Sequence, residues 1–338
     1  MLTPSLSTPA FRSASGSNLA ANPSWQPTNH PERLPVGSAR SHATVTPLAN
    51  PEEWNSFRML GIHVDNFSMS EAIGTILRAA SGNAAASFAF VNADCLNIAS
   101  NDKAYAAILA RQTRVFADGS GIALAARLRG ITVRENINGT DMFPLLCAAA
   151  AERGLRIFLL GGRPDIAGRA AANMAEEFPD LCIAGTHDGY FDASQEAAVI
   201  SMINQSGADI LLVGLGAPRQ EKWIAAHRAS LSPKAIMAVG GLFDYYSGRV
   251  WRAPVVMRRS GFEWVWRLMQ EPARLWRRYI LGNPRFLARC LLEQLSEARR
   301  VRNVPGLIRN FDRHGRSPQL PELPASTSSV TYVMRGQS

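Results

Sequence analysis

The stretch "ADILLVGLGAPRQEKWIAAHRASLSPKAIMAVGG", residues 208–241, joins two short apolar runs through a polar segment with helical spacing. Two buried strands connected by a helix form a parallel βαβ unit. The first run ends at Gly214 and the second at Gly240, and glycine permits a tight turn directly after a strand. This stretch therefore predicts an α/β fold built on a parallel sheet.

The same alternation extends toward the N-terminus. Apolar runs of strand length occupy 86–91, 113–117, 155–162 and 181–187, with helical patterns between them, and 57–66 reads as a short strand or hairpin. Strands that alternate with helices of about 10–15 residues are typical of α/β folds. We expect a largely parallel, Rossmann-like sheet with flanking helices.

Composition divides the 338 residues into four segments. Residues 1–52 and 313–338 are rich in Ser, Pro, Asn and Thr, and we expect both to be disordered. Residues 53–246 carry the α/β alternation, and 247–312 form a basic helical appendage. The sequence contains no apolar run of about 18 residues and no signal-peptide core, so we expect no membrane-spanning helix.

The four cysteines, at 95, 147, 182 and 290, are far apart and lack CxxC spacing. We therefore expect small buried thiols in a reducing, cytoplasmic compartment rather than disulfides or a zinc site. HExxH, DxD and P-loop motifs are also missing. The sequence predicts neither a metal ion nor a cofactor.

Positive charge is concentrated near the C-terminus. Residues 249–316 contain sixteen arginines, no lysine and five acidic residues, whereas the net charge of the whole chain is only +9. Such a segment favours an anionic partner: phosphate groups, an anionic membrane face or nucleic acid.

Residues 262–281 of that segment read as helical, and Pro272 either opens a second helix or kinks the first. On an unbroken helix Arg267, Arg274 and Arg278 fall within about 40° of one another, with Arg277 to one side. The apolar and aromatic residues between them would suit a membrane interface.

Chemistry is expected where the strands end, because ligands of parallel sheets bind beyond the carboxyl ends of the strands. Gly214 and Gly216 permit close approach of a ligand to the backbone, and Pro218 can start the next helix. Gln220 and Glu221 then lie in its first turn, where Glu221 alternatively serves only to complement the helix dipole. The GxGxxG fingerprint of dinucleotide-binding folds is absent.

A second strand end carries "VFADGSG", residues 115–121. Asp118 follows an apolar run, and partial burial would raise its pKa toward that of a useful base, although Asp-Gly also forms ordinary turns. Thr140 or Asp141 is expected to cap a helix at "NGTDMF". Further strand ends offer Asn92, Asp94, Gly161, Gly162 and Asp244.

Together these residues resemble the WecG/TagA/CpsF family of glycosyltransferases. The resemblance covers roughly residues 57–280 and rests on "FADGSG", "NGTDMF", "LLGG", "DILLVGLGAPRQEKW", "VGGLFDYYSGRVWRAP" and "EWVWRLMQEPARLWRR", in the order of the family. It implies metal-independent, inverting transfer of a sugar from a UDP-sugar to a polyprenyl-diphosphate-linked saccharide, at the cytoplasmic face of the membrane, in surface or exopolysaccharide biosynthesis.

The resemblance also implies roles for single residues. Asp118 matches the general base, the "GLGAPRQE" loop lines the nucleotide-sugar pocket, and appendage arginines bind the diphosphate. The predicted substrate-binding residues are Asn92, Gly119, Thr140, Asp141, Gly162, Gly214, Gly216, Pro218, Arg219, Gln220, Glu221, Asp244, Arg267, Arg274 and Arg277.

One position departs from the family, where a threonine often stands two residues before the asparagine that ends the strand. Here Phe90 precedes Asn92, so the donor sugar stays open, as do the acceptor saccharide and whether the chain forms a homo-oligomer. Two rivals are an NAD-dependent or other sugar-nucleotide enzyme and a nucleic-acid-binding protein. A nucleic-acid-binding protein would not need an α/β body with polar or glycine residues at five strand ends. We therefore expect no nucleic-acid partner.

Overall fold

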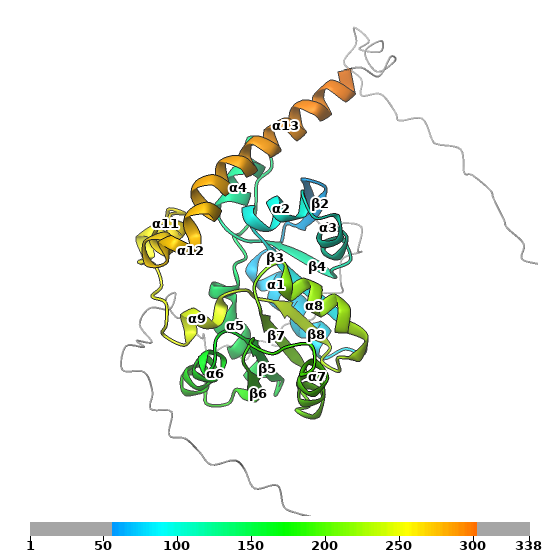
Figure 1. Cartoon of the computed structure of the whole chain (residues 1–338), viewed down its shortest axis with the longest axis vertical. Coiled ribbons are helices and arrows are strands. Elements are labelled where there is room, and N and C mark those ends of the chain that lie inside the picture. Colours follow the sequence, from blue (N-terminus) through cyan, green and yellow to red (C-terminus); the bar gives the residue numbers. More distant parts are fainter. Residues whose placement is uncertain (1–55, 303–338) are drawn as a thin grey trace, which may run out of the picture. The chain divides into compact units, whose positions relative to one another are not determined.

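The computed structural model describes residues 56–302 (Figure 1), so the expected disorder of 1–52 and 313–338 concerns residues outside this range. Eight strands form one sheet in the order β1-β2-β4-β3-β8-β7-β5-β6. All neighbouring strands are parallel except β1 and β2, which form an antiparallel hairpin. The predicted α/β fold with a largely parallel sheet is confirmed.

The apolar runs form strands close to their predicted ranges. The strands are β1 (Ser56–Met59), β2 (Ile62–Asp65), β3 (Ala86–Val91), β4 (Arg114–Ala117), β5 (Arg156–Gly161), β6 (Cys182–His187), β7 (Ile210–Gly214) and β8 (Ala235–Ala238).

The sheet consists of two halves, each made from a continuous part of the chain. The first four strands in sequence form the block β1-β2-β4-β3, and the last four form β8-β7-β5-β6. Only the pairing of β3 with β8, in which Phe88 lies opposite Met237, joins the halves. The chain adds strands in opposite directions on the two sides of this parallel pair, so the pair is a topological switch point, where α/β sheets bind ligands.

Helices cover both faces of the sheet, as Figure 1 shows for α6 and α7 on either side of β5 and β6. One face is covered by α1 (Met69–Ala80), α5 (Gly139–Ala151), α6 (Ile166–Glu177) and α9 (Leu242–Tyr246). The other is covered by α2 (Ala93–Ala99), α3 (Lys103–Ala110), α4 (Ser120–Leu128), α7 (Glu196–Gln205) and α8 (Arg219–His227), which ends in the short helix η3 (Arg228–Ser230).

Alternate residues of each strand enter opposite cores, as the pleat of a strand requires. In β3, Phe88 and Phe90 pack under the first group of helices, whereas Ala89 and Val91 pack under the second. Each large side chain buried in this way contributes roughly 1.5–3 kcal/mol. The two-sided burial explains why the strands read as continuous apolar runs.

The basic segment is helical, as predicted. It comprises α10 (Val255–Arg259), α11 (Glu263–Gln270), α12 (Pro272–Trp276), the π-helical turn η4 (Arg277–Leu281) and α13 (Gly282–Arg302). Pro272 opens α12 as its first residue, so the second helix of the two alternatives is the one that forms.

Part of this segment belongs to the core of the body. Leu275, Phe286 and Cys290 are buried, and Phe286 and Cys290 pack with α2, α3 and α4. The compact unit that contains the sheet ends at Glu293, and the rest of α13, from Gln294, belongs to a second unit. The predicted domain boundary at residue 246 stays a prediction.

Within residues 56–302 no helix is both long enough and apolar enough to cross a lipid bilayer. The four cysteines are free thiols. Cys95, Cys147 and Cys290 are buried as expected, but Cys182 is exposed, because it begins β6 at the edge of the sheet.

Candidate functional site

The predicted site residues gather at the carboxyl ends of five neighbouring strands. Asp118 follows β4, Asn92 follows β3, Asp244 lies in α9 after β8, and Gly216 and Gly162 follow β7 and β5. These strands span the seam between the two halves of the sheet. These residues therefore lie along the edge of the sheet that contains the switch point, where parallel sheets bind ligands.

Asp118 lies beside the seam. Its backbone N–H donates to Val91 O at 2.9 Å, which fixes the residue against the end of β3, and Asn92 Nδ2 lies 3.5 Å from Asp118 Oδ2. Burial raises the pKa of Asp118 from 3.8 to about 6, against the opposing effects of Asn92 and the nearby Arg278. A carboxylate with this pKa is ionised at neutral pH and more basic than a free aspartate.

Asn92 is held by the start of α2. Its Oδ1 accepts hydrogen bonds from the backbone N–H groups of Asp94, at 3.1 Å, and Cys95, at 3.2 Å, so that Asn92 is the N-cap of the helix. The cap occupies the amide oxygen and leaves the amide nitrogen to face Asp118. These two strand-end residues therefore lie side by side.

Gly119 makes the turn that follows Asp118. Its φ of 93° lies in the region that only glycine adopts without strain, and its N–H donates to Asn136 Oδ1 at 2.5 Å. Helix α4 then begins at Ser120, whose Oγ donates to Gly261 O at 2.9 Å. This contact joins the loop of Asp118 to the segment between α10 and α11.

The glycines after β5 and β7 allow two backbones to approach closely. Gly162 N donates to Gly214 O at 3.1 Å, and a Cβ on Gly161 would lie 2.4 Å from that same oxygen. Packing therefore accounts for Gly161 and Gly214. Gly216 has a φ of 78° and no atom near the place of a Cβ, so its conformation rather than crowding requires glycine.

Gln220, which is itself bonded to Glu221, connects the loops after two neighbouring strands. Gln220 Oε1 accepts from Gly216 N at 3.1 Å and from Gly240 N at 2.9 Å, and thus ties the loop after β7 to the loop after β8. Gln220 Nε2 donates to Glu221 Oε1 at 2.9 Å. Both side chains are at most 3 % exposed, so their contribution to substrate binding stays a prediction.

The neighbouring residues of the same motif lie in different surroundings. Pro218 is the N-cap residue of α8 and follows a cis peptide bond. Arg219 extends away from the seam, with Nη2 3.5 Å from Phe191 O and its guanidinium over the Phe191 ring. Trp223 is buried in the core, as expected.

The first turn of α5 brings a carboxylate to the site. Asn138, rather than Thr140 or Asp141, caps this helix: its Oδ1 accepts from Asp141 N at 2.7 Å, and its Nδ2 donates to Asp141 Oδ2 at 2.6 Å. The predicted cap was wrong because asparagine fills the cap position two residues before Thr140. Thr140 contributes its backbone oxygen, which accepts from Tyr246 Oη at 2.6 Å.

Two predicted arginines gather around one carboxylate. Glu271 lies 3.6 Å from Arg267, 3.1 Å from Arg274 and 3.3 Å from Arg249, which also pairs with Asp244 at 3.0 Å. Three arginines around a single glutamate leave a positive excess there.

Arg267 and Arg277 differ in their positions. Arg267 lies over the ring of Tyr245 and within 3.0 Å of the place of a Cβ on Gly241, so it reaches the end of β8. Arg277 is exposed and lies over Trp276.

Arg278, which the resemblance did not assign to the substrate, acts on the predicted base. Arg278 Nε lies 3.4 Å from Asp94, and its charge lowers the pKa of Asp118. Both arginines lie in the π-helical turn at 277–281, where Arg278 pairs with Asp94 and Arg277 is exposed. Helical spacing alone had placed Arg278 beside Arg267 and Arg274.

Sequence reasoning missed Arg252, Arg258 and Glu263. Arg252 forms a hydrogen-bonded ion pair with Asp141, and Arg258 Nη1 lies 3.7 Å from the same carboxylate. Burial raises the pKa of Glu263, which lies on the first turn of α11. The only signal in the sequence was that Arg252 lies within the "VWRAP" motif.

No group of three or more His, Cys, Asp or Glu side chains between residues 56 and 302 is arranged to hold a metal ion. The charged groups around Asp118 are instead carboxylates paired with arginines. Such an arrangement can accept a proton at Asp118 and stabilise anionic groups at the arginines.

Comparison with known proteins agrees with this geometry. The sequence profile of the family described as "Glycosyl transferase WecG/TagA/CpsF family" matches residues 57–300. A protein of Bacillus subtilis (strain 168), named N-acetylglucosaminyldiphosphoundecaprenol N-acetyl-beta-D-mannosaminyltransferase, is 34% identical over 208 residues, which cover 61% of this chain and 79% of the relative.

Proposed function

Because this chain belongs to the WecG/TagA/CpsF family and is a glycosyltransferase, we propose that it moves a hexosyl or N-acetylhexosaminyl group from a UDP-sugar to a polyprenyl-diphosphate-linked saccharide. The name of the Bacillus subtilis relative describes transfer of N-acetylmannosamine to an N-acetylglucosamine carried on undecaprenyl diphosphate, which supports a lipid-linked acceptor here. The product would enter the assembly of a cell-surface polysaccharide.

The observation that carries the proposal is the carboxylate of Asp118, partly buried at the seam and held by Asn92. Asp118 accepts the proton of the attacking acceptor hydroxyl. The oxygen then forms a bond to the anomeric carbon while the bond from that carbon to the UDP oxygen breaks, and UDP leaves with the electron pair. Attack opposite the leaving group inverts the anomeric configuration.

The leaving diphosphate needs positive charge as its bond breaks. Arg267, Arg274 and Arg277 supply it in the proposal, and Glu271 holds the first two in the absence of substrate. Guanidinium groups bind phosphate oxygens in a bidentate fork and can replace a divalent cation in this role. We therefore expect transfer to continue in the presence of a metal chelator.

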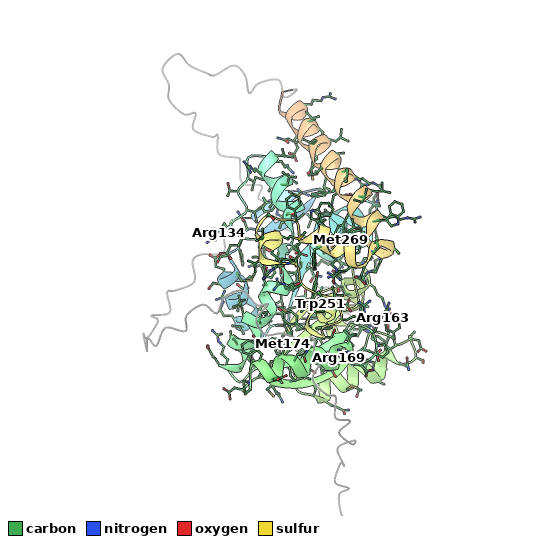
Figure 2. The ribbon with its side chains drawn as sticks, turned by 90° about the vertical axis from the view of Figure 1, so that its left-hand side faces the viewer. Arg134, Arg163, Arg169, Met174, Trp251 and Met269 are labelled. Carbon is green, nitrogen blue, oxygen red and sulfur yellow. The ribbon has the colours of Figure 1, made fainter. Side chains whose placement is uncertain are left out.

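The acceptor would be reached at the inner face of the membrane, to which the protein would bind peripherally. Supporting this, the segment from residue 251 to 292 exposes large apolar side chains between its arginines; two of them, Trp251 and Met269, are labelled in Figure 2. The others are Val255, Val256, Phe262, Trp276, Ile280, Leu281, Leu291 and Leu292. Aromatic and basic residues together favour the headgroup region of an anionic bilayer.

A transfer assay tests the proposal. Wild-type protein is incubated with a panel of UDP-sugars and a lipid-linked disaccharide or monosaccharide acceptor, with and without EDTA, and UDP release and product are measured. Asp118→Asn should lower kcat by about 10²–10⁴-fold while UDP binding, measured by calorimetry, is retained. Near-normal turnover of the folded Asn variant would remove Asp118 from the mechanism.

A further inference from the structure

A cluster of four charged side chains adjoins the catalytic residue. Asp141 comes from the first turn of α5, Arg252 from the loop after α9, Arg258 from α10 and Glu263 from the first turn of α11. Arg252 Nη2 donates to Asp141 Oδ1, and Arg252 Nε lies 3.9 Å from Glu263 Oε1. We call Asp141, Arg252, Arg258 and Glu263 the Arg252 cluster.

Arg252 is buried without all of its hydrogen bonds. Its side chain is 9% exposed, yet neither Nε nor Nη1 has a hydrogen-bond partner in the structure. Arginine is seldom buried, and an unsatisfied buried donor is destabilising. A bound ligand that places an acceptor atom against these donors would satisfy them.

The cluster is rigid and close to Asp118. Asn138 holds the Asp141 carboxylate by a 2.6 Å hydrogen bond, and the Tyr246 hydroxyl anchors the same turn through Thr140 O. Ile137 N donates to Ala117 O at 2.9 Å and Gly119 N donates to Asn136 Oδ1 at 2.5 Å, so the segment that leads into α5 lies against the loop of Asp118. A ligand on the Arg252 cluster would therefore lie next to the reacting atoms.

The charges of the cluster indicate which chemical group it takes. Asp141 and Glu263 balance Arg252 and Arg258, so a phosphate group here would meet two carboxylates. Around Glu271, by contrast, Arg249, Arg267 and Arg274 leave a positive excess. A sugar hydroxyl both donates and accepts hydrogen bonds, and it suits a guanidinium flanked by carboxylates.

We propose that the Arg252 cluster binds hydroxyl or amide groups of a hexose or hexosamine beside Asp118, whereas the arginines around Glu271 bind the diphosphate. The proposal rests on the proposed function. The sugar belongs either to the UDP-sugar donor, which brings the anomeric carbon, or to the saccharide of the lipid-linked acceptor, which brings the attacking oxygen. Both have the same hydroxyl and amide groups next to the reacting atom.

The test separates sugar recognition from nucleotide recognition. Glu263→Gln and Arg252→Lys are compared with Arg134→Gln, which removes a solvent-exposed ion pair with Glu71. Donor and acceptor concentrations are varied separately in the transfer assay, and binding of UDP alone is measured by calorimetry. Thermal unfolding shows whether each variant is folded. Of the pair Arg252 and Glu263, Glu263 is the less buried, and glutamine keeps its shape, so Glu263→Gln alone decides the test if Arg252→Lys does not fold.

We expect the KM of one sugar substrate to rise roughly 10- to 100-fold, as for loss of a charge-assisted hydrogen bond, with UDP affinity unchanged within about twofold. A rise in the donor KM assigns the cluster to the donor sugar, and a rise in the acceptor KM assigns it to the acceptor. UDP affinity that falls together with transfer, or unchanged KM values in the folded variants, would overturn the proposal. Wild-type protein that transfers no sugar would instead overturn the proposed function, and this inference with it.

Discussion

At the scale of single residues, the environment of Asp118 determines what its carboxylate can do. The sequence places this residue at a strand end, but its pKa depends on groups from distant parts of the chain: Arg278, Asp141 and Glu263. Burial has the largest effect and raises the pKa. Two measurements follow, one on activity and one on stability.

For activity, the general base must be ionised. With a pKa of about 6 for Asp118, kcat/KM should rise with pH through about 6 and become constant above it, instead of rising near the ordinary aspartate value of 3.8. Initial rates between pH 4.5 and 8.5 measure the profile. A profile that is flat down to pH 5 would mean that Asp118 is not the titrating base.

For stability, the raised pKa has a definite sign. Between about pH 4 and 6 the folded protein keeps a proton on Asp118, whereas the unfolded chain has released it. This difference contributes to the free energy of unfolding in full below the window, and the contribution is lost as the pH rises through about 6. A shift of about two pKa units corresponds to at most about 3 kcal/mol.

Asp118→Asn lacks this titration. Its Tm relative to wild type should therefore be higher at pH 8 than at pH 4, as scanning calorimetry at the two pH values would measure. Equal Tm differences at both pH values would contradict the raised pKa.

Single residues also show the limits of sequence reasoning. Asp118 and Asn92 were placed together because parallel strands end at one edge of the sheet, a relation that the strand pattern contains. The cap of α5 was misplaced by two residues because Asn138, Thr140 and Asp141 are all good cap residues, and only backbone geometry selects among them. Arg252 was missed because burial of an arginine depends on tertiary packing alone.

At the scale of secondary-structure elements, close approach of β5 and β7 shapes the edge on which the site is built. Gly161 has a φ of 136°, and a Cβ there would lie 2.4 Å from Gly214 O, against backbone that cannot move aside. In α1, by contrast, a Cβ on Gly74 would meet only the tip of the Arg78 side chain, at 3.4 Å.

The same substitution should therefore have opposite effects at these two glycines. Gly161→Ala should lower the free energy of unfolding by roughly 2 kcal/mol or more, because both the conformation and the contact become strained. Gly74→Ala should raise it by about 0.5–1 kcal/mol, since alanine favours a helix interior. Urea denaturation of both variants measures the contrast, and a neutral Gly161→Ala would show that the strand ends are not in close contact.

Elements also differ in how well the sequence predicts them. The strands were predicted to within about two or three residues because burial on both faces makes them continuous apolar runs. In the basic segment Pro272 was correctly predicted to open a helix as one alternative, but the π-helical turn that follows at 277–281 has no sequence signature.

At the scale of the whole molecule, the exposed apolar residues of the basic segment should mediate membrane binding. Ile280 and Leu281 are 50% and 57% exposed, and Met202 on α7 is 45% exposed and provides a matched control. Replacing Ile280 and Leu281 together by glutamate should lower co-sedimentation with vesicles containing phosphatidylglycerol about tenfold or more, because charge at headgroup depth opposes insertion.

Met202→Glu should sediment like wild type, and binding of the wild type should weaken with salt. Unchanged sedimentation of the double variant would exclude this surface as the membrane contact.

The seam between the halves of the sheet has a consequence for biosynthesis. Strand β3 ends at Val91, but its partner β8 begins at Ala235, so the ribosome adds more than a hundred residues before the central pairing can form. Until then the nascent N-terminal half has an unpaired, apolar strand at its edge, the kind of surface on which chains aggregate. Asn92 and Gly240 come together only when that edge is covered, so the proposed catalytic site can be completed only after β8 has been synthesised.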